Sequence, residues 1–273
     1  MLHDLKTSFV QRTFFETADD NYIVARWCYI NKLPADFHWL AVHAIEKFIK
    51  AALLLNGKSA KKGAHNVCVL FEKLRGGWPA LLPDVLTVPD EHRRGRPDET
   101  PAKFLKRLYA NGNEHNRYAL LGYAHYPRDL FLVDQIVFAV RRLCLNLEGL
   151  VFPQKPELGT HAEQLAKDAT FAFWDPRSRL DMALAGKRGD AIKFAAATWN
   201  LPFCPGTAPQ ERLHSTLGSS NSPLYQYVLD PRIRKGQGRV AADDAKALKE
   251  WVVENVVLPK EVVEQLDQAW PQP

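Results

Sequence analysis

The sequence predicts an all-α protein, and three observations support that prediction. Strand patterns are nearly absent along its 273 residues. Apolar residues recur instead at helical spacing, most clearly over residues 36–57, DFHWLAVHAIEKFIKAALLLNG, and again after Pro127. Prolines and glycines fall at the ends of these segments, where helices start and stop.

The segment 36–57 predicts the central helix of the fold. Asp36 stands at the expected N-cap, and Gly57 at the expected C-terminal end, where glycine accepts the left-handed conformation. Glu46 and Lys50 lie one turn apart on the polar face. The apolar face is expected to be buried against neighbouring helices; it comprises Phe37, Leu40, Ala41, Ala44, Ile45, Phe48, Ile49, Ala52 and Leu53.

Other segments predict the helices that surround the central one. A helix over 19–33 ends before Pro34, and the short turn favours antiparallel packing on the central helix. Residues 81–100 are expected to form an exposed, irregular connection. Further helices are expected at residues 66–74, 102–110, 127–149, 180–185, 191–199, 224–229 and 241–257, with a last one ending near Trp270.

Residues 151–160, with two prolines, form the best candidate boundary in the chain. We therefore expect a helical bundle over 1–150 and a helical C-terminal extension of unknown role over 151–273. The extension holds an apolar group that either packs on the bundle or lines a groove for a ligand or partner. This group comprises Phe171, Phe173, Trp174, Trp199, Leu201 and Phe203.

Composition restricts the class of protein. The net charge of +5 is compatible with a phosphate-bearing partner without requiring one. Four scattered cysteines, without a CxxC pair, predict reduced and buried thiols. No signal peptide is visible, and no apolar run approaches the roughly 20 residues that span a bilayer. These features predict a cytoplasmic protein without a membrane contact.

Residues 20–74 resemble the HEPN domain, a helical bundle first associated with nucleotide binding, and the wider similarity covers roughly residues 10–150. The first matching helix is of the DxY…AR type and the third begins with a GHN-like sequence that has one inserted residue. Arg117 and Tyr118 resemble the family's entry to its last helix. The matching residues are Asp20, Tyr22, Ala25 and Arg26, then His43, Ala44, Glu46, Lys47, Lys50, Ala51, Leu53 and Gly57, then Gly63, Ala64, His65 and Asn66.

The resemblance implies an antiparallel bundle, a homodimer and a role in binding nucleotides, RNA or a protein partner encoded nearby. Some members are metal-independent ribonucleases, which use an Arg followed four to six residues later by a His. Here Arg117 and His125 are separated by seven residues. This departure favours a non-catalytic binding protein; the alternative is a metal-independent endoribonuclease of the toxin or defence type.

In that alternative, Arg117 and His125 are the catalytic candidates. A histidine can move the proton of the 2′-hydroxyl, and an arginine can stabilise the charged phosphorane. The structural interpretation is that Arg117 pairs with a buried acid and His125 caps the helix after Pro127.

The candidate phosphate-binding residues lie in and after a basic loop. Lys58, Lys61 and Lys62 precede His65 and Asn66, which open a helix where free amides attract anions. The simpler interpretation is a solvated loop, with Asn66 as the helix cap.

Arg26 completes the candidate phosphate-binding set. In the expected helix pair it lies beside Glu46, with which it forms a structural ion pair or by which it is oriented as a site arginine. No cofactor motif is present: His38 and His43 have the wrong spacing for a helical zinc site, and no Walker, GxGxxG or GxSxG frame occurs in a fitting context.

Overall fold

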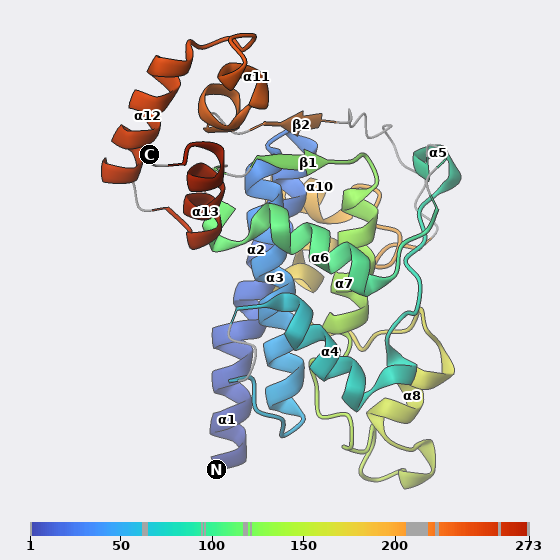
Figure 1. Cartoon of the computed structure of the whole chain (residues 1–273). Coiled ribbons are helices and arrows are strands. Elements are labelled where there is room, and N and C mark those ends of the chain that lie inside the picture. The colour runs from blue at the N-terminus through green and yellow to red at the C-terminus, as the bar shows by residue number, and fades with distance from the viewer. Residues whose placement is uncertain are drawn as a thin grey trace. The chain divides into compact units, whose positions relative to one another are not determined.

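The computed structural model describes residues 2–61, 65–93, 95, 97–116, 120, 122–205, 218–221, 224–255 and 258–271 (Figure 1). The chain forms two compact units: residues 1–112 with 126–216, and residues 113–125 with 217–273. This division does not follow the boundary expected near residue 150. Apolar residues between 160 and 200 belong to the core of the first unit, among them Leu165, Leu180 and Ala195.

The first unit begins with a continuous helical rod. α1 (Leu2–Val10) continues through a π-helical turn (Gln11–Phe15) into α2 (Glu16–Ile30), so the helix expected from residue 19 starts earlier. A short turn, in which Lys32 has a φ of +61°, then reverses the chain. α3 (Pro34–Leu55) therefore runs back along α2, as predicted.

The ends of α3 differ partly from the expectation. The helix begins at Pro34 with Leu33 as N-cap, so the predicted N-cap role of Asp36 is wrong. Proline at the first helical position is favoured because its φ is already helical and its missing N–H is not needed there. At the other end Gly57 has a φ of +70°, which confirms its predicted left-handed conformation.

α3 lies at the centre of the first unit. It contacts α2, α4 (Val67–Gly77), α6 (Pro101–Gly112) and α7 (Asp129–Arg141). At the close approach of α6, a Cβ at Gly112 would lie 2.2 Å from the carbonyl oxygen of His38, so glycine is required. The predicted apolar face of α3 is fully buried except for Leu40, which is half-buried.

α7 is shorter than the helix expected over residues 127–149. After Arg141 the chain leaves the helix through tight turns. The side chain of Asn56 then forms hydrogen bonds with the main chain that follows. Asn56 Nδ2 donates to the carbonyl of Leu145 at 2.9 Å, and Asn56 Oδ1 accepts from the amide of Leu147 at 2.8 Å. These bonds satisfy main-chain groups that a longer helix would have paired. The chain therefore leaves the helix although the apolar pattern of the sequence continues.

Residues 81–100 are less exposed than predicted. A β-bridge joins Leu86 to Glu99, α5 spans Asp90–Arg93, and Leu81, Leu82, Leu86 and Val88 are buried. The prolines and charges of this segment prevent regular structure, while its apolar residues cover the core.

Three short helices complete the described part of the first unit: α8 (His161–Lys167), α9 (Arg179–Leu184) and α10 (Asp190–Ala197). Thr160 and Glu163 form a capping box at α8. α9 and α10 pack on α2, where their buried alanines allow close contact.

The second unit has a small apolar core of its own, made by Leu224, Val228, Val262 and Leu266. Its helices are α11 (Pro231–Arg234), α12 (Ala242–Asn255) and α13 (Lys260–Ala269), with a π-helical turn at Tyr225–Leu229. β1 (Tyr123–His125) pairs antiparallel with β2 (Gly218–Ser220).

The described residues are predominantly helical in both units, which confirms the predicted all-α class. Among these residues, no helix combines the length and the apolar character that crossing a membrane would demand.

Candidate functional site: a lysine-lined pocket

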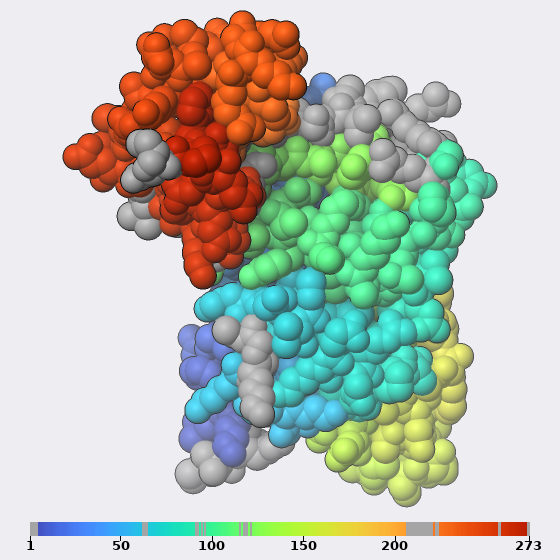
Figure 2. Space-filling model, in the orientation of Figure 1, coloured from blue at the N-terminus to red at the C-terminus, as the bar shows by residue number. Residues whose placement is uncertain are grey.

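A surface pocket of about 1,000 Å³ lies between α1, the π-helical turn, the end of α3 and the loop that follows it. In Figure 2, α1 (blue) and the region after α3 (light blue) adjoin at the surface of the first unit. Lys58 and Lys61, two of the predicted phosphate-binding residues, line this pocket. The other lining residues are Leu5, Lys6, Thr7, Phe9, Val10, Phe14, Lys50, Leu54, Leu55, Gly57, Ser59 and Ala60.

Among the described residues that line the pocket, four are lysines and none is acidic. Lys50 is neutralised, because its Nζ donates to Glu46 Oε1 at 2.6 Å. In the part of the chain that the structure describes, Lys6, Lys58 and Lys61 have no carboxylate within 4.0 Å. The Nζ of Lys58 lies 4.1 Å from the centre of the Trp78 ring, a cation–π contact that holds the ammonium group over that ring. The pocket therefore carries a local positive charge.

Aromatic and aliphatic side chains also line the pocket. Phe9 is 61% exposed, and its ring meets Phe14 edge-to-face with centroids 6.4 Å apart. Leu5, one turn before Phe9, is 62% exposed. Large apolar side chains exposed beside several cations are typical of a binding surface.

A cluster centred on Glu46 adjoins the pocket through Lys50. Glu46 is almost wholly buried, and its Oε1 lies 3.1 Å from Nδ1 of the exposed His65 as well as accepting from Lys50. The structure thus places His65 beside a lysine of the pocket. Glu46 shares its charge between these two groups and orients both of them.

Asn66 acts as a helix cap, as the simpler interpretation predicted. Its Oδ1 accepts from the amides of Cys68 and Val69 at 3.0 and 3.2 Å. These are the amides that would otherwise attract an anion at the start of α4. Lys62 lies outside the described residues.

Arg26 is fully buried and takes no part in the pocket. It pairs with Asp134 on α7 and donates through Nε to the carbonyl of Ala195 at 2.7 Å. Burial, the largest single effect, would lower the pKa of Arg26, but the interactions with Asp134 and Tyr22 together outweigh it and the pKa is raised. The ion pair expected between Arg26 and Glu46 is therefore not formed.

Tyr22 extends this buried network. Its hydroxyl donates to Asp134 at 2.6 Å, and burial together with that carboxylate raises its pKa. A second buried network lies nearby: Arg141 Nε donates to Asp19 at 2.9 Å, and its Nη2 contacts Asp181 at 3.2 Å. These partners are far apart in the sequence, so no spacing rule could have identified them.

The structure does not bring the catalytic candidates into a described site. Arg117 lies outside the described residues. His125 is buried at the end of β1 in the second unit, where its backbone pairs with Gly218. The N-cap residue of α7 is Arg128.

Comparison of the chain with protein-family models, curated proteins and solved structures finds no match.

Proposed function

We propose that this protein is a HEPN-like, non-catalytic binding protein that holds the phosphate groups of a nucleotide or of single-stranded RNA in the lysine-lined pocket. The observation that supports the proposal most is the set of three lysines without carboxylate partners around one pocket. Unpaired cations on a concave surface concentrate anions, and phosphates are the anions that nucleic acids present in series.

The apolar residues of the pocket lining favour a nucleic-acid ligand over a simple anion. Single-strand binders combine a cationic groove with aromatic rings on which bases stack. Phe9 offers an exposed ring in the same pocket lining that contains Lys6 and Lys58. A base resting on Phe9 would leave its phosphates among the lysines. Stacking of this kind tolerates every base, so we expect weak sequence preference.

We also propose that the protein acts as a homodimer or with a protein partner encoded nearby. The support for this part is the resemblance of residues 20–74 to the HEPN domain, whose members commonly assemble in these ways.

The experiment is a titration of a fluorescently labelled, short oligouridylate followed by anisotropy at several salt concentrations. For three phosphate contacts the slope of log K against log salt is about −2.1, so raising salt from about 50 to about 200 mM weakens binding roughly 20-fold. In the variant Lys58→Gln/Lys61→Gln one contact remains. We expect a slope of about −0.7 and weaker binding throughout.

The matched control is Lys167→Gln/Lys187→Gln, which removes the same charge from exposed positions outside the pocket. Equal weakening by both double variants would show that only net charge matters and would refute the pocket. Absence of binding at low salt would refute the nucleic-acid proposal. Competition by UMP or ATP at equal phosphate concentration distinguishes a nucleotide site from one that requires a longer strand.

A further inference from the structure

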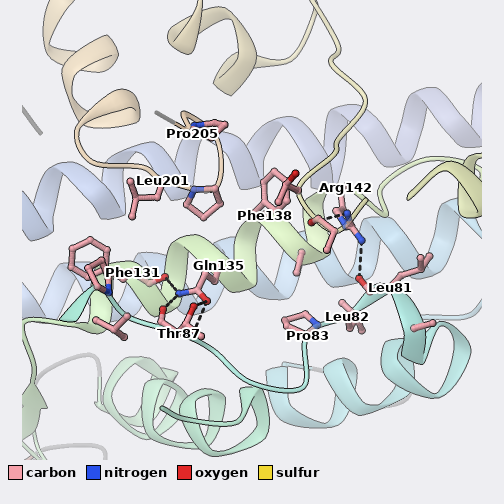
Figure 3. Close-up of a pocket in the computed structure, with 17 residues that line it drawn as sticks. Leu81, Leu82, Pro83, Thr87, Phe131, Gln135, Phe138, Arg142, Leu201 and Pro205 are labelled. Carbon is pink, nitrogen blue, oxygen red and sulfur yellow. Dashed lines mark hydrogen bonds between the residues drawn. The ribbon is translucent and has the colours of Figure 1, made fainter. Parts of the chain in front are cut away.

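A second, largely apolar groove of about 770 Å³ runs along one side of α7 (Figure 3). Its other walls are the segment of residues 80–89 and the turn of residues 201–205. The α7 side is formed by Phe131, Gln135, Phe138, Ala139 and Arg142, which recur every three or four residues. They cover roughly 16 Å of helix at 1.5 Å per residue. The groove is therefore long and narrow rather than round.

Few polar side chains line this groove, and that of Gln135 is satisfied by the main chain of Thr87. Gln135 Oε1 accepts from the amide of Thr87 at 2.9 Å, and its Nε2 donates back to the carbonyl of Thr87 (Figure 3). This pair fastens the segment 80–89 across α7. Of the lining residues that the structure describes, Arg142 is the one with a charged side chain.

Arg142 lies at one end of the groove and is only 6% exposed. Its Nη1 donates to the carbonyls of Asp168, Ala169 and Phe171 at 2.9–3.0 Å. Its Nη2 donates to the carbonyls of Leu81 and Leu165, both at 3.3 Å, which is long for such bonds. Every partner is a neutral main-chain group.

The other buried arginines of the described chain are different. Arg26 pairs with Asp134, Arg128 with Glu99, and Arg141 with Asp19 and Asp181. For Arg142 the described residues provide no carboxylate within 4.0 Å. Burial lowers the pKa of Arg142, against a weaker opposing effect of the exposed Asp168. A buried charge without a counter-ion is costly, and an anion in the groove would relieve that cost.

We propose that the groove binds a fatty acid, with its carboxylate paired to Arg142 and its unbranched chain lying along α7 towards Phe131. The single charge at one end of an apolar channel matches a ligand with one anionic head and an apolar tail. The long bonds from Nη2 can be exchanged for a charge-assisted pair with the carboxylate. A nucleotide would leave most of its polar groups unpaired against walls of leucine, proline and phenylalanine.

The volume of the groove agrees with this ligand class. Small-molecule sites commonly enclose about 300–1,000 Å³ and bury most of the ligand against apolar side chains. In this proposal the chain of the ligand ends near Phe131, whose ring packs edge-to-face on the ring of Trp199 with centroids 5.0 Å apart.

The test uses the full chain with cis-parinaric acid as a fluorescent probe, displaced by dodecanoate, dodecanol or dodecyltrimethylammonium below their micellar concentrations. These competitors share one tail and differ only in head-group charge. We expect dodecanoate to displace the probe at least about tenfold more effectively than dodecanol, because a hydrogen-bonded charge pair is worth about that factor. The cation should be weakest. Equal displacement by all three would overturn the proposal, as would failure of the probe to bind.

Two variants locate the binding. Ala139→Phe fills the middle of the groove and should reduce probe affinity at least about tenfold, whereas Ala191→Phe, at an exposed position of α10, should not. Equal affinities for these variants would place binding elsewhere and refute the groove.

Arg142→Met should reduce the preference for dodecanoate over dodecanol to within about twofold, and Arg142→Lys should restore part of it. Retention of the full preference in Arg142→Met would contradict the head-group assignment. If loss of the carbonyl contacts unfolds Arg142→Met, the competitor series and Ala139→Phe still decide the question.

Discussion

The buried carboxylate of Asp134 allows the sharpest test of how the first unit is held together. It accepts from Arg26 on one oxygen and from the Tyr22 hydroxyl on the other. Arg26 donates in addition to the carbonyls of Ala195 and Thr198. Asp134→Asn keeps the shape of the side chain but leaves the guanidinium of Arg26 buried without a counter-ion.

The expected cost follows from this burial. Arg26 and Asp134 are 0% and 1% exposed, so solvent cannot replace the lost charge. Removing one partner of a buried pair costs about 3–5 kcal/mol in the free energy of unfolding. For a unit of this size, 1 kcal/mol corresponds to about 2–4 °C in Tm, which gives a fall of roughly 6–20 °C. Tyr22→Phe, which removes only one bond to a charged group, should cost about 1.5–3 kcal/mol.

Urea unfolding followed by circular dichroism and tryptophan fluorescence measures these differences. Asp84→Asn is the matched control, because Asp84 pairs with Arg75 but is 85% exposed, and such pairs contribute at most about 1 kcal/mol. If Asp134→Asn were no more destabilising than Asp84→Asn, the argument that the buried pair fixes α2 against α7 would be refuted.

Two further predictions concern the helix cap at Asn66 and the catalytic candidates. Asn66→Ala should destabilise the protein by about 0.5–2 kcal/mol through loss of the cap on α4, whereas Asn66→Asp should be nearly neutral. Equal Tm values for Asn66→Ala and the wild type would contradict the cap. Total RNA incubated with the protein in excess chelator should stay intact, as it should with Arg117→Ala/His125→Ala. Cleavage by the wild type that the double variant loses would instead support the ribonuclease alternative.

The helices of the first unit could be predicted because burial there follows a simple period. The apolar face of α3, the turn before Pro34 and the end at Gly57 all depend on neighbouring residues. Local rules therefore identified them. They also identified Asn66 as a cap, since the residue precedes an apolar segment directly.

Other features depend on residues that only the fold brings together. The pattern after Arg141 remains apolar, yet the chain leaves the helix because Asn56 supplies the hydrogen bonds. The charges and prolines of residues 81–100 indicate exposure, but Leu86 and Val88 are buried in the core of the first unit. Of the predicted phosphate-binding residues, Lys58 and Lys61 line a pocket together with Phe9 of α1. The sequence of α1 has no clear apolar period, so its part in the pocket could not be predicted.

The arginines show why charge in a sequence is a poor guide to a site until partners are known. Arg26 matched a family motif and was a candidate for phosphate binding, yet its charge is fully used by Asp134, a residue 108 positions away. Arg142 matched no motif, yet it is the buried arginine of the described chain without a carboxylate partner, and it ends an apolar groove. Arg26 is structural because the protein itself supplies its counter-ion, Asp134. Arg142 is bonded only to neutral main-chain carbonyls, and for that reason the groove, rather than the motif, is where we propose an anionic ligand with an apolar tail.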